Sequence, residues 1–502
     1  MSKANAKYSF VDLFAGIGGF HAALAATGGV CEYAVEIDRE AAAVYERNWN
    51  KPALGDITDD ANDEGVTLRG YDGPIAVLTG GFPCQPVSTS GAQHGMAETR
   101  GTLFWNIARI IEEREPTVLI LENVRNLVGP RHRHEWLTII ETLRFFGYEV
   151  SGAPAIFSPH LLPAWMGGTP QVRERVFITA TLVPERMRDE RIPRTETGEI
   201  DAEAIGPKPV ATMNDRFPIK KGGTELFHPG DRKSGWNLLT SGIIREGDTE
   251  PSTVALRLTA TETLWIDAWD DLESTIRRAT GRPLEGFPYW ADSWTDFREL
   301  SRLVVIRGFQ APEREVVGDR KRYVARTDMP EGFVPASVTR PAIDETLPAW
   351  KQSHLRRNYD FFERHFAEVV AWAYRWGVYT DLFPASRRKL EWQAQDAPRL
   401  WDTVMHFRPS GIRAKRPTYL PALVAITQTS IVGPLERRLS PRETARLQGL
   451  PEWFDFGEQR AAATYKQMGN GVNVGVVRHI LREHVRRDRA LLKLTPAGPV
   501  AE

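Results

Sequence analysis

The chain has 502 residues, more than one ordinary domain holds, so we expect a large α/β domain and at least one further unit. The formal net charge of −1 excludes the overall basic surplus that many nucleic-acid enzymes carry, although local clusters such as Arg320–Arg322 remain either contact sites or solvated surface. No apolar run reaches the length of a membrane span, and Met1–Lys7 lacks the apolar core of a signal peptide, so we expect a cytoplasmic protein.

The first third of the chain alternates between apolar runs typical of buried strands and the periodicity of helices. This alternation predicts a Rossmann-like α/β fold, with a mostly parallel sheet and helices on both faces. In such sheets the ligand lies beyond the carboxyl ends of the strands. The expected strands are Tyr8–Leu13, Cys31–Ile37, Ile75–Thr79, Thr117–Leu121 and Arg175–Ala180, and the expected helices are Thr102–Arg114 and His134–Phe146.

The pattern changes after about residue 184, where Pro, Gly and Trp become frequent and the alternation is lost. Within this irregular stretch Phe361–Trp376 has helical periodicity. Helical signals return at Ser440, where Ser440–Glu443 is similar to a capping box, and a last helix is expected at about Val474–Leu492. We therefore divide the chain into residues 1–184, an insert at 185–435, and a completion of the first domain at 436–502.

Three loop motifs follow the expected strands. Asp12–Gly19 is a Gly-rich turn that could hold NAD, FAD or a phosphate, or could simply be a tight turn. Glu36-Ile37-Asp38 ends the next strand, where an acid can bind ribose hydroxyls. Asp56 could accept a hydrogen bond from an adenine amino group or could stabilise a turn. These motifs indicate a nucleoside-containing cofactor without defining which one.

The two cysteines cannot form a disulfide framework or a zinc site made of cysteine pairs. Cys31 lies in an apolar run and is expected in the core, whereas Cys84 lies between two prolines after a strand, where a thiol is held in place for nucleophilic attack. Val87–Arg100 reads as a mobile loop that could close over a substrate. Glu122 could be a helix cap or a general acid, and Gln171–Arg175 an edge-strand pattern or part of the site.

Taken together, the motifs resemble those of the prokaryotic DNA cytosine-5 methyltransferases of restriction-modification systems. They occur in that family's order and cover about residues 8–182 and 435–480, leaving the middle of the chain unmatched. The motifs are DLFAGIGGF, EID, GDI, GGFPCQPVSTSG, RGTLF, ENV, PQVRERVF, LSPRETARLQGLP and MGNGVNV. The family often has Ser where this chain has Gly471. The resemblance implies transfer of a methyl group from S-adenosylmethionine to carbon 5 of cytosine.

The resemblance also implies the roles of the site residues. Cys84 would attack carbon 6 of the ring, Glu122 would act at N3, and Arg173 would bind O2, with Asn123 as local support. Arg173 and Arg175 would favour the thiolate. No metal is expected. The residues expected around S-adenosylmethionine are Phe14, Ala15, Gly16, Gly18, Gly19, Glu36, Ile37, Asp56, Ile57, Gly81, Pro83, Leu103, Asn470 and Val472.

The substrate implied is a cytosine flipped out of double-stranded DNA, and the insert stands where the family has its target-recognition domain. We expect a monomer on DNA in the bacterial cytoplasm, associated with the nucleoid, and a separate restriction endonuclease as its counterpart. The DNA contacts expected are Gln85, Ser88, Arg413, Lys415 and Arg416.

Three alternatives remain open at this stage. A tRNA cytosine-5 methyltransferase shares the fold, but its Cys-Phe-Thr signature would need a third cysteine. An NAD-dependent oxidoreductase explains Gly16, Gly18 and Glu36 but leaves Cys84 and Glu122 without a role. A DNA-binding protein with an inactive catalytic site is disfavoured by the presence of Cys84, Glu122 and Arg173.

Overall fold

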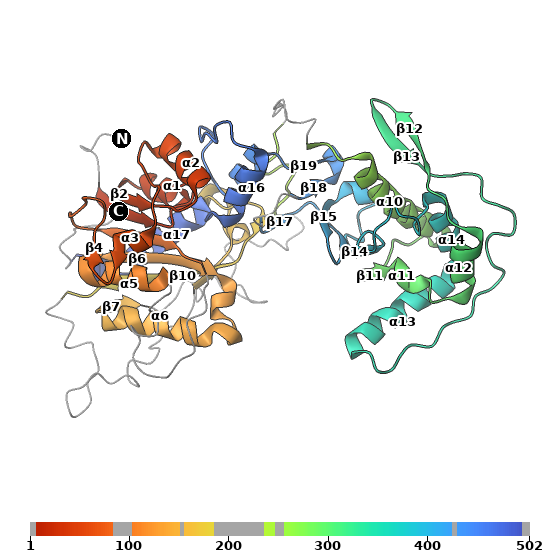
Figure 1. Ribbon diagram of the computed structural model, residues 1–502, viewed down its shortest axis with the longest axis horizontal. Helices are drawn as coiled ribbons and strands as arrows, with labels where there is room; N and C mark the ends of the chain where they lie inside the picture. The colour runs from red at the N-terminus through yellow and green to blue at the C-terminus, as the bar shows by residue number, and fades with distance from the viewer. Residues whose placement is uncertain are drawn as a thin grey trace. The chain divides into compact units, whose positions relative to one another are not determined.

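Figure 1 shows the computed structural model, which describes residues 7–83, 103–150, 155–184, 235–245, 256–423 and 429–493. The chain divides into two compact units. The first comprises residues 1–243, 421–427 and 441–502, and the second comprises residues 244–420 and 428–440. Residues 235–243 thus lie in the first unit, whereas the division made from the sequence counts them with the insert.

A seven-stranded sheet forms the centre of the first unit, in the order β2-β1-β5-β6-β10-β7, with β8 also paired to β10. The pairs β1–β2, β1–β5 and β5–β6 are parallel, and β10 runs antiparallel to β6, β7 and β8. Only β10 is therefore reversed in this sheet. The strands are β1 (Tyr8–Leu13), β2 (Gly29–Val35), β5 (Val77–Gly81), β6 (Val118–Val124), β7 (Tyr148–Val150), β8 (Ala155–Phe157) and β10 (Arg175–Leu182).

Helices cover both faces of this sheet, which confirms the α/β prediction. Side chains alternate along β1, so Phe10 packs with α1 (Gly19–Ala25) and α17 (Val474–Arg487). Val11 points the other way, into the core that α5 (Leu103–Arg114) and α6 (Arg133–Phe145) share. The mostly parallel arrangement is confirmed as well, and the reversed β10 was not predicted because strand direction leaves no mark on hydrophobic periodicity.

The C-terminal segment packs against the N-terminal part of the chain, at α1 and at the turn before α2. It contains α15 (Pro441–Leu447), α16 (Ala461–Asn470), α17 and α18 (Arg489–Leu492). Val476 and Ile480 of α17 share a core with Phe20 of α1. The Lys466 ammonium lies 2.7 Å from a carboxylate oxygen of Asp38, just before α2 (Arg39–Trp49). The two ends of the chain therefore belong to one folded unit.

The second unit has a six-stranded sheet of its own, in the order β11-β14-β16-β15-β18-β19. Its core is rich in tryptophan, and Trp269, Trp294, Trp372 and Trp392 are fully buried. The expectation of an irregular fold is wrong here, because these large rings fill a core without a regular series of aliphatic residues. The predicted helix Phe361–Trp376 is divided at His365 between α13 (Ala349–Arg364) and α14 (Phe366–Trp376).

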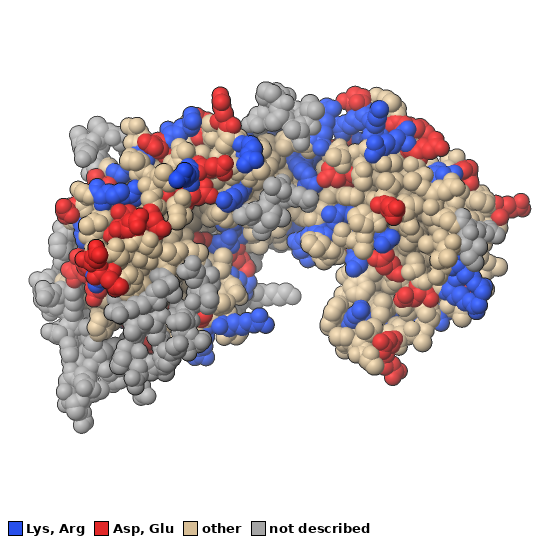
Figure 2. All heavy atoms as spheres, in the orientation of Figure 1, with Lys and Arg blue, Asp and Glu red and all other residues tan. Residues whose placement is uncertain are grey.

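The helices and strands not yet named are short, apart from α10. No helix in the described ranges is both long and apolar enough to cross a membrane. Lys, Arg, Asp and Glu are mixed over the surface shown in Figure 2. The other helices and strands are α3 (Ile57–Asp60), β3 (Ala61–Asn62), β4 (Gly65–Val66), β9 (Gln171–Val172), α10 (Ala260–Thr280), β11 (Pro288–Trp290), α11 (Ala291–Trp294), α12 (Arg298–Arg302), β12 (Glu313–Val317), β13 (Arg320–Val324), β14 (Lys389–Gln393), β15 (Val404–Arg408), β16 (Gly411–Lys415), β17 (Leu420–Pro421), β18 (Ile431–Val432) and β19 (Arg437–Arg438).

Candidate active site

The carboxyl ends of four neighbouring strands meet at one edge of the first unit's sheet. Leu13 of β1 pairs with Val35 of β2 and with Gly80 of β5. Gly81 of β5 pairs with Glu122 of β6. The loops that follow these strands are therefore neighbours, as the sequence-based argument requires of a ligand site.

In the first loop, the space beside Gly16 is open, whereas Gly18 is tightly packed. Phe14 and Gly16 have φ of +54° and +55°, and the space where a Gly16 side chain would lie is empty. At Gly18, with φ of +91°, a Cβ atom would lie 2.0 Å from Nε1 of Trp49. That indole nitrogen donates a hydrogen bond to the Ile17 carbonyl at 3.1 Å. Gly16 thus leaves room for a ligand, while Gly18 lets α2 approach the loop.

Glu36 holds this loop in place. One carboxylate oxygen accepts from the backbone N–H of Gly16 and the other from that of Asp38, each at 2.8 Å. Burial raises the pKa of Glu36 above its ordinary value, while these backbone hydrogen bonds lower it. The adjacent Ile37 side chain is 66% exposed and offers an apolar surface next to the carboxylate.

The third loop differs in part from the expectation. The Asp56 carboxylate caps α3 by accepting from the Thr58 backbone N–H at 2.9 Å, as a turn aspartate would. The Ile57 side chain is buried in the core, so only its backbone can face a ligand.

A carboxyl group and a guanidinium group meet where β5, β6 and β10 lie together. Glu122 is buried, and Nε of Arg175 lies 3.0 Å from its carboxylate oxygen. Burial raises the pKa of Glu122, and the charges of Arg175 and Arg173 lower it, with burial prevailing. A Cβ atom at Gly81 would lie 3.4 Å from the second Glu122 oxygen, so glycine keeps this carboxyl accessible from β5. This pairing of an acid with a cation suits an anionic reaction intermediate.

Asn123 links this pair to the segment that carries the candidate nucleophile. Its Nδ2 atom donates to the Phe82 carbonyl at 2.9 Å, and its Oδ1 atom accepts from the Val124 N–H at 2.8 Å. Phe82 stands two residues before Cys84 in the sequence. Cys84, Gln85 and Ser88 themselves lie outside the described residues.

Arg173 occupies a different place from Arg175. It is 2% exposed, and its Nη1 atom donates to the Leu423 carbonyl at 3.1 Å. Its Nη2 atom donates to the carbonyls of Gly469 and Gly471 at 2.8 and 2.7 Å. The guanidinium therefore ties the turn before β10 to the C-terminal segment. Arg173 therefore has backbone partners, and Arg175 is the guanidinium that lies beside Glu122.

The other expected cofactor residues are spread around the same edge. Ala15 and Gly19 are buried in the turn, and a Cβ atom at Gly19 would lie 2.8 Å from the Val472 side chain. Pro83 and Asn470 are exposed. Leu103 is the first residue of α5 and is half-buried.

The expected DNA contacts in the second unit already have partners within the protein. Nε of Arg413 lies 2.7 Å from a carboxylate oxygen of Glu391, and Arg416 pairs with Asp396. The Lys415 ammonium lies 4.0 Å from the centre of the Tyr419 ring. Burial and the charges of Arg413 and Arg408 lower the pKa of Lys415 to about 8.

Asp12 belongs to the motif Asp12–Gly19, but no role could be assigned to it from the sequence. It is fully buried, and the Thr79 hydroxyl donates to its Oδ1 atom at 3.0 Å. Burial raises the pKa of Asp12 to about 8, so the carboxyl group is largely protonated near neutral pH. The available signal was a single acid in the mostly apolar strand Tyr8–Leu13.

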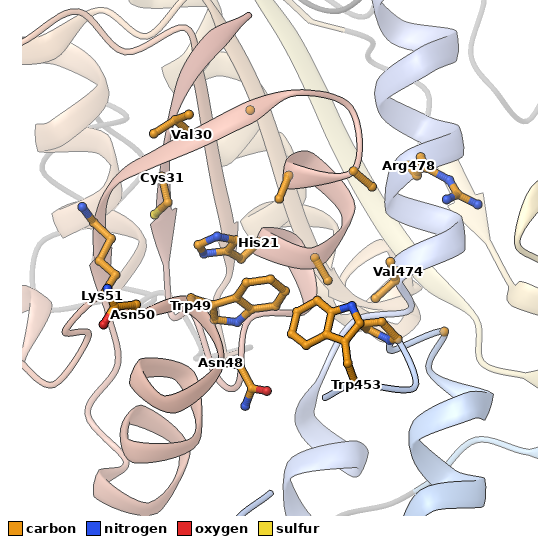
Figure 3. A pocket seen from close by; sticks show the side chains of 16 residues that line it. His21, Val30, Cys31, Asn48, Trp49, Asn50, Lys51, Trp453, Val474 and Arg478 are labelled. Carbon is orange, nitrogen blue, oxygen red and sulfur yellow. The ribbon is translucent and has the colours of Figure 1, made fainter. Parts of the chain in front are cut away.

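A pocket of about 690 Å³ lies at the start of β2, whereas the cofactor candidates follow its end. Figure 3 shows Trp49 in the middle of it, with His21 on one side and Trp453 on the other. His21 stacks on Trp49 at 4.1 Å between ring centres, and burial lowers the pKa of His21 to about 3. None of the expected site residues lines this pocket, so it is separate from the candidate site.

Comparison with known proteins defines the class of this protein. The chain belongs to the family of C-5 cytosine-specific DNA methylases, whose model matches residues 8–486. It is 99% identical over 498 residues to the type II methyltransferase M.AluI of Cellulosimicrobium cellulans, covering 99% of this chain and 96% of that protein. It is 39% identical over 169 residues to the type II methyltransferase M.HhaI of Haemophilus parahaemolyticus, covering 34% of this chain and 47% of that protein.

Among solved structures, the Dnmt2 methyltransferase of S. pombe matches with 14% identity and a TM-score of 0.41, over 95% of this chain and 98% of that one. The family match confirms the resemblance seen in the sequence. The protein is a DNA (cytosine-5)-methyltransferase, and its methyl donor is S-adenosylmethionine.

The strand-end loops fit this cofactor. The space beside Gly16 is open to a ligand, and the Glu36 carboxylate lies at that loop with the exposed Ile37 beside it. A carboxylate suits ribose hydroxyls, and an exposed apolar side chain suits the face of an adenine ring. Charge, hydrogen-bonding capacity and free space thus match S-adenosylmethionine.

Proposed function

We propose that this enzyme methylates a cytosine flipped out of one recognition sequence in duplex DNA, as the modification enzyme of a type II restriction-modification system. The observation that carries the proposal is the buried Glu122–Arg175 pair. The next residue, Asn123, donates to the Phe82 carbonyl in the segment that leads to Cys84. The near identity to a protein named as a type II methyltransferase supports the biological setting.

The proposed reaction begins at Cys84, whose thiolate adds to carbon 6 of the cytosine. The addition makes carbon 5 nucleophilic and places negative charge on N3 and O2. Glu122 holds a proton at N3, for which its raised pKa is suited, and Arg175 donates to O2. When bound, S-adenosylmethionine supplies an electrophilic methyl group. Carbon 5 would bond to this methyl group as the donor leaves as S-adenosylhomocysteine. A water molecule would then take the carbon 5 proton, N3 would return its proton to Glu122, and the bond between sulfur and carbon 6 would break to restore the ring and the thiolate.

In this proposal the two units have different functions. The first unit binds the cofactor and carries out the chemistry, with Phe14, Gly16, Glu36, Ile37 and Asp56 around the cofactor. The second unit, residues 244–420 and 428–440, recognises the target sequence. The enzyme acts as a monomer on DNA in the bacterial cytoplasm, and a separate endonuclease cuts the unmodified sequence.

The first experiment is methyl transfer from labelled S-adenosylmethionine to unmodified duplex DNA and, separately, to tRNA. We expect label on DNA only, and bisulfite sequencing should place it at carbon 5 of cytosine in one short recurring context. Label on tRNA alone would overturn the substrate, and label on neither would favour an inactive catalytic site.

Substitution of the nucleophile provides the mechanistic test. Cys84→Ala should reduce methyl transfer by on the order of 10³-fold or more, because no other group forms the covalent bond. Cofactor crosslinking by ultraviolet light should survive in this variant. Cys31→Ala is the matched control, since this thiol is buried in the core and should be dispensable for transfer. Normal activity of Cys84→Ala would rule out the covalent route.

A further inference from the structure

The six-stranded sheet of the second unit has two unlike faces. Met405, Ile412 and Ala414 of β15 and β16 point into the tryptophan-rich core on one face. Because side chains alternate along a strand, the neighbouring positions point to the opposite face. By this alternation, the side chains on that face are Lys389, Glu391, Gln393, Val404, His406, Arg408, Arg413 and Lys415.

Positive charge is concentrated on this second face. Arg413 pairs directly with His406 across β15–β16 and with Glu391 across β14–β16. Glu391 forms an ion pair with Arg413. Among the described residues, Lys415 and Arg408 have no carboxylate partner within 4.0 Å. Four cations thus share this face with a single carboxylate, with Lys389 placed 5.8 Å from the centre of the Trp290 ring, and Figure 2 shows Lys and Arg atoms gathered where β14 and β15 lie in Figure 1.

The cations on this face act on one another through space. Burial and the charge of Arg413 lower the pKa of Arg408. Like charges held together in a partly buried place are unfavourable unless an anion lies among them. The folded protein therefore keeps an arrangement that an anionic ligand would stabilise.

His406 provides a second and independent indication of a ligand. Its Nε2 atom is buried and has no hydrogen-bond partner in the described part of the chain. Its Nδ1 atom lies 3.4 Å from the Ser430 hydroxyl, which can donate to it and leave the proton on Nε2. Burial of an unpaired polar atom costs free energy, and a ligand oxygen at Nε2 would remove that cost.

We propose that His406, Arg408, Arg413 and Lys415 form a phosphate site, and that it holds one backbone phosphate of the DNA during methylation. The inference rests on the proposed function, since it needs duplex DNA as the substrate. Phosphate oxygens accept from the guanidinium, ammonium and imidazole N–H groups that meet here. A backbone contact orients the duplex and carries no sequence information of its own. Arg416 does not belong to this site, since it lies beyond the end of β16 and pairs with Asp396.

The test is DNA binding by full-length Lys415→Gln and Arg408→Gln at several salt concentrations. Two duplexes are compared, one with the mapped target sequence and one without it. Each variant should bind both duplexes more weakly by the same factor. The slope of log affinity against log salt should shrink by about 0.9 for each lost phosphate contact. Lys321→Gln is the charge-matched control, because Lys321 is exposed on β13 of the same unit and should leave the slope unchanged.

Two further variants and one competitor complete the test. Lys415→Arg keeps the charge and should retain the wild-type salt slope, and His406→Phe should weaken both duplexes alike. An unchanged affinity in Lys415→Gln, or a loss confined to the target duplex, would overturn the inference. A further result would also overturn it: inorganic phosphate raises the melting temperature of the wild type but not of Lys415→Gln, while the two proteins bind DNA with equal affinity. Wild-type methylation, measured in parallel, separates these results from a failure of the proposed function.

Discussion

Arg173 and Arg175 stand two positions apart in the motif Gln171–Arg175, and the structure gives them different surroundings. Arg175 contacts the Glu122 carboxylate, whereas Arg173 donates to three backbone carbonyls. The sequence could not separate them, because the residue type is the same and the partners of Arg173 lie about 250 to 300 positions further along the chain. Long-range packing thus gives two similar side chains different surroundings.

The two arginines should therefore respond differently to substitution. Arg173→Ala leaves three carbonyls unpaired, each worth about 1–3 kcal/mol, so the free energy of unfolding should fall by several kcal/mol. Arg175→Ala should lower single-turnover methyl transfer on the order of 10²-fold, because the charge beside Glu122 and O2 is lost. Its stability should change less. Urea unfolding and single-turnover kinetics measure the two effects. A stable but inactive Arg173→Ala would return the base contact to Arg173.

Glu122 is a second residue whose role the sequence leaves open and whose surroundings the structure defines. Motif spacing could place it at a strand end but could not say whether it is a cap or an acid. The structure adds its burial and the contact with Arg175, and burial raises the pKa of this carboxyl group. Ionisable groups with shifted pKa values in such places are candidates for proton transfer. The chemical role therefore depends on packing that the sequence does not display.

At the scale of elements, the sequence predicts the central strands well. β1 coincides with the expected Tyr8–Leu13, and α5 ends at Arg114, where the expected helix Thr102–Arg114 ends. Long apolar runs define such buried elements. The second unit's sheet was missed because its strands have only two to five residues each, which is too short for a clear periodicity. Single residues such as His365 also end a helix without a Pro or Gly signal.

The segment 235–245 is the element whose place the sequence could not predict. Trp236 is buried and its indole N–H donates to the His160 carbonyl at 2.9 Å. Arg446 of α15 donates to the Ile243 carbonyl at 3.1 Å. These contacts hold residues 235–243 in the first unit through side chains that are far apart in the chain.

Substitution of Trp236 tests this attachment. Trp236→Ala should destabilise the first unit by about 3–5 kcal/mol, since it removes a large buried ring. Trp236→Phe keeps most of the volume and should cost about 1 kcal/mol for the lost hydrogen bond. Trp165→Ala is the control, because that ring is 81% exposed in the same unit. Equal stability of Trp236→Ala and Trp165→Ala in urea would show that the segment is not held there.

At the scale of the whole molecule, each unit buries ionisable groups in a core of its own. The first unit buries His21, His479 and His484, whose pKa values burial lowers to about 3, 4 and 4. Because unfolding lets these bases take up protons, their contribution to stability is present above about pH 6.5 and is lost as the pH falls toward 4. The net charge of −1 gives no hint of this, since it counts charges without their burial.

Asp12 changes the free energy of unfolding with pH in the opposite direction to the histidines, and this difference can be measured. Its folded pKa of about 8 exceeds the unfolded value of 3.8, so its contribution is full below pH 3.8 and is lost as the pH rises to 8. Between pH 5 and 6.5 it lowers the slope of unfolding free energy against pH by about 1.36 kcal/mol per unit. Asp12→Asn keeps the acceptor for Thr79 and should steepen the rise by that amount, as measured by amide hydrogen exchange in β1 and β5. A slope equal to that of the wild type would mean that Asp12 is ionised in the folded protein.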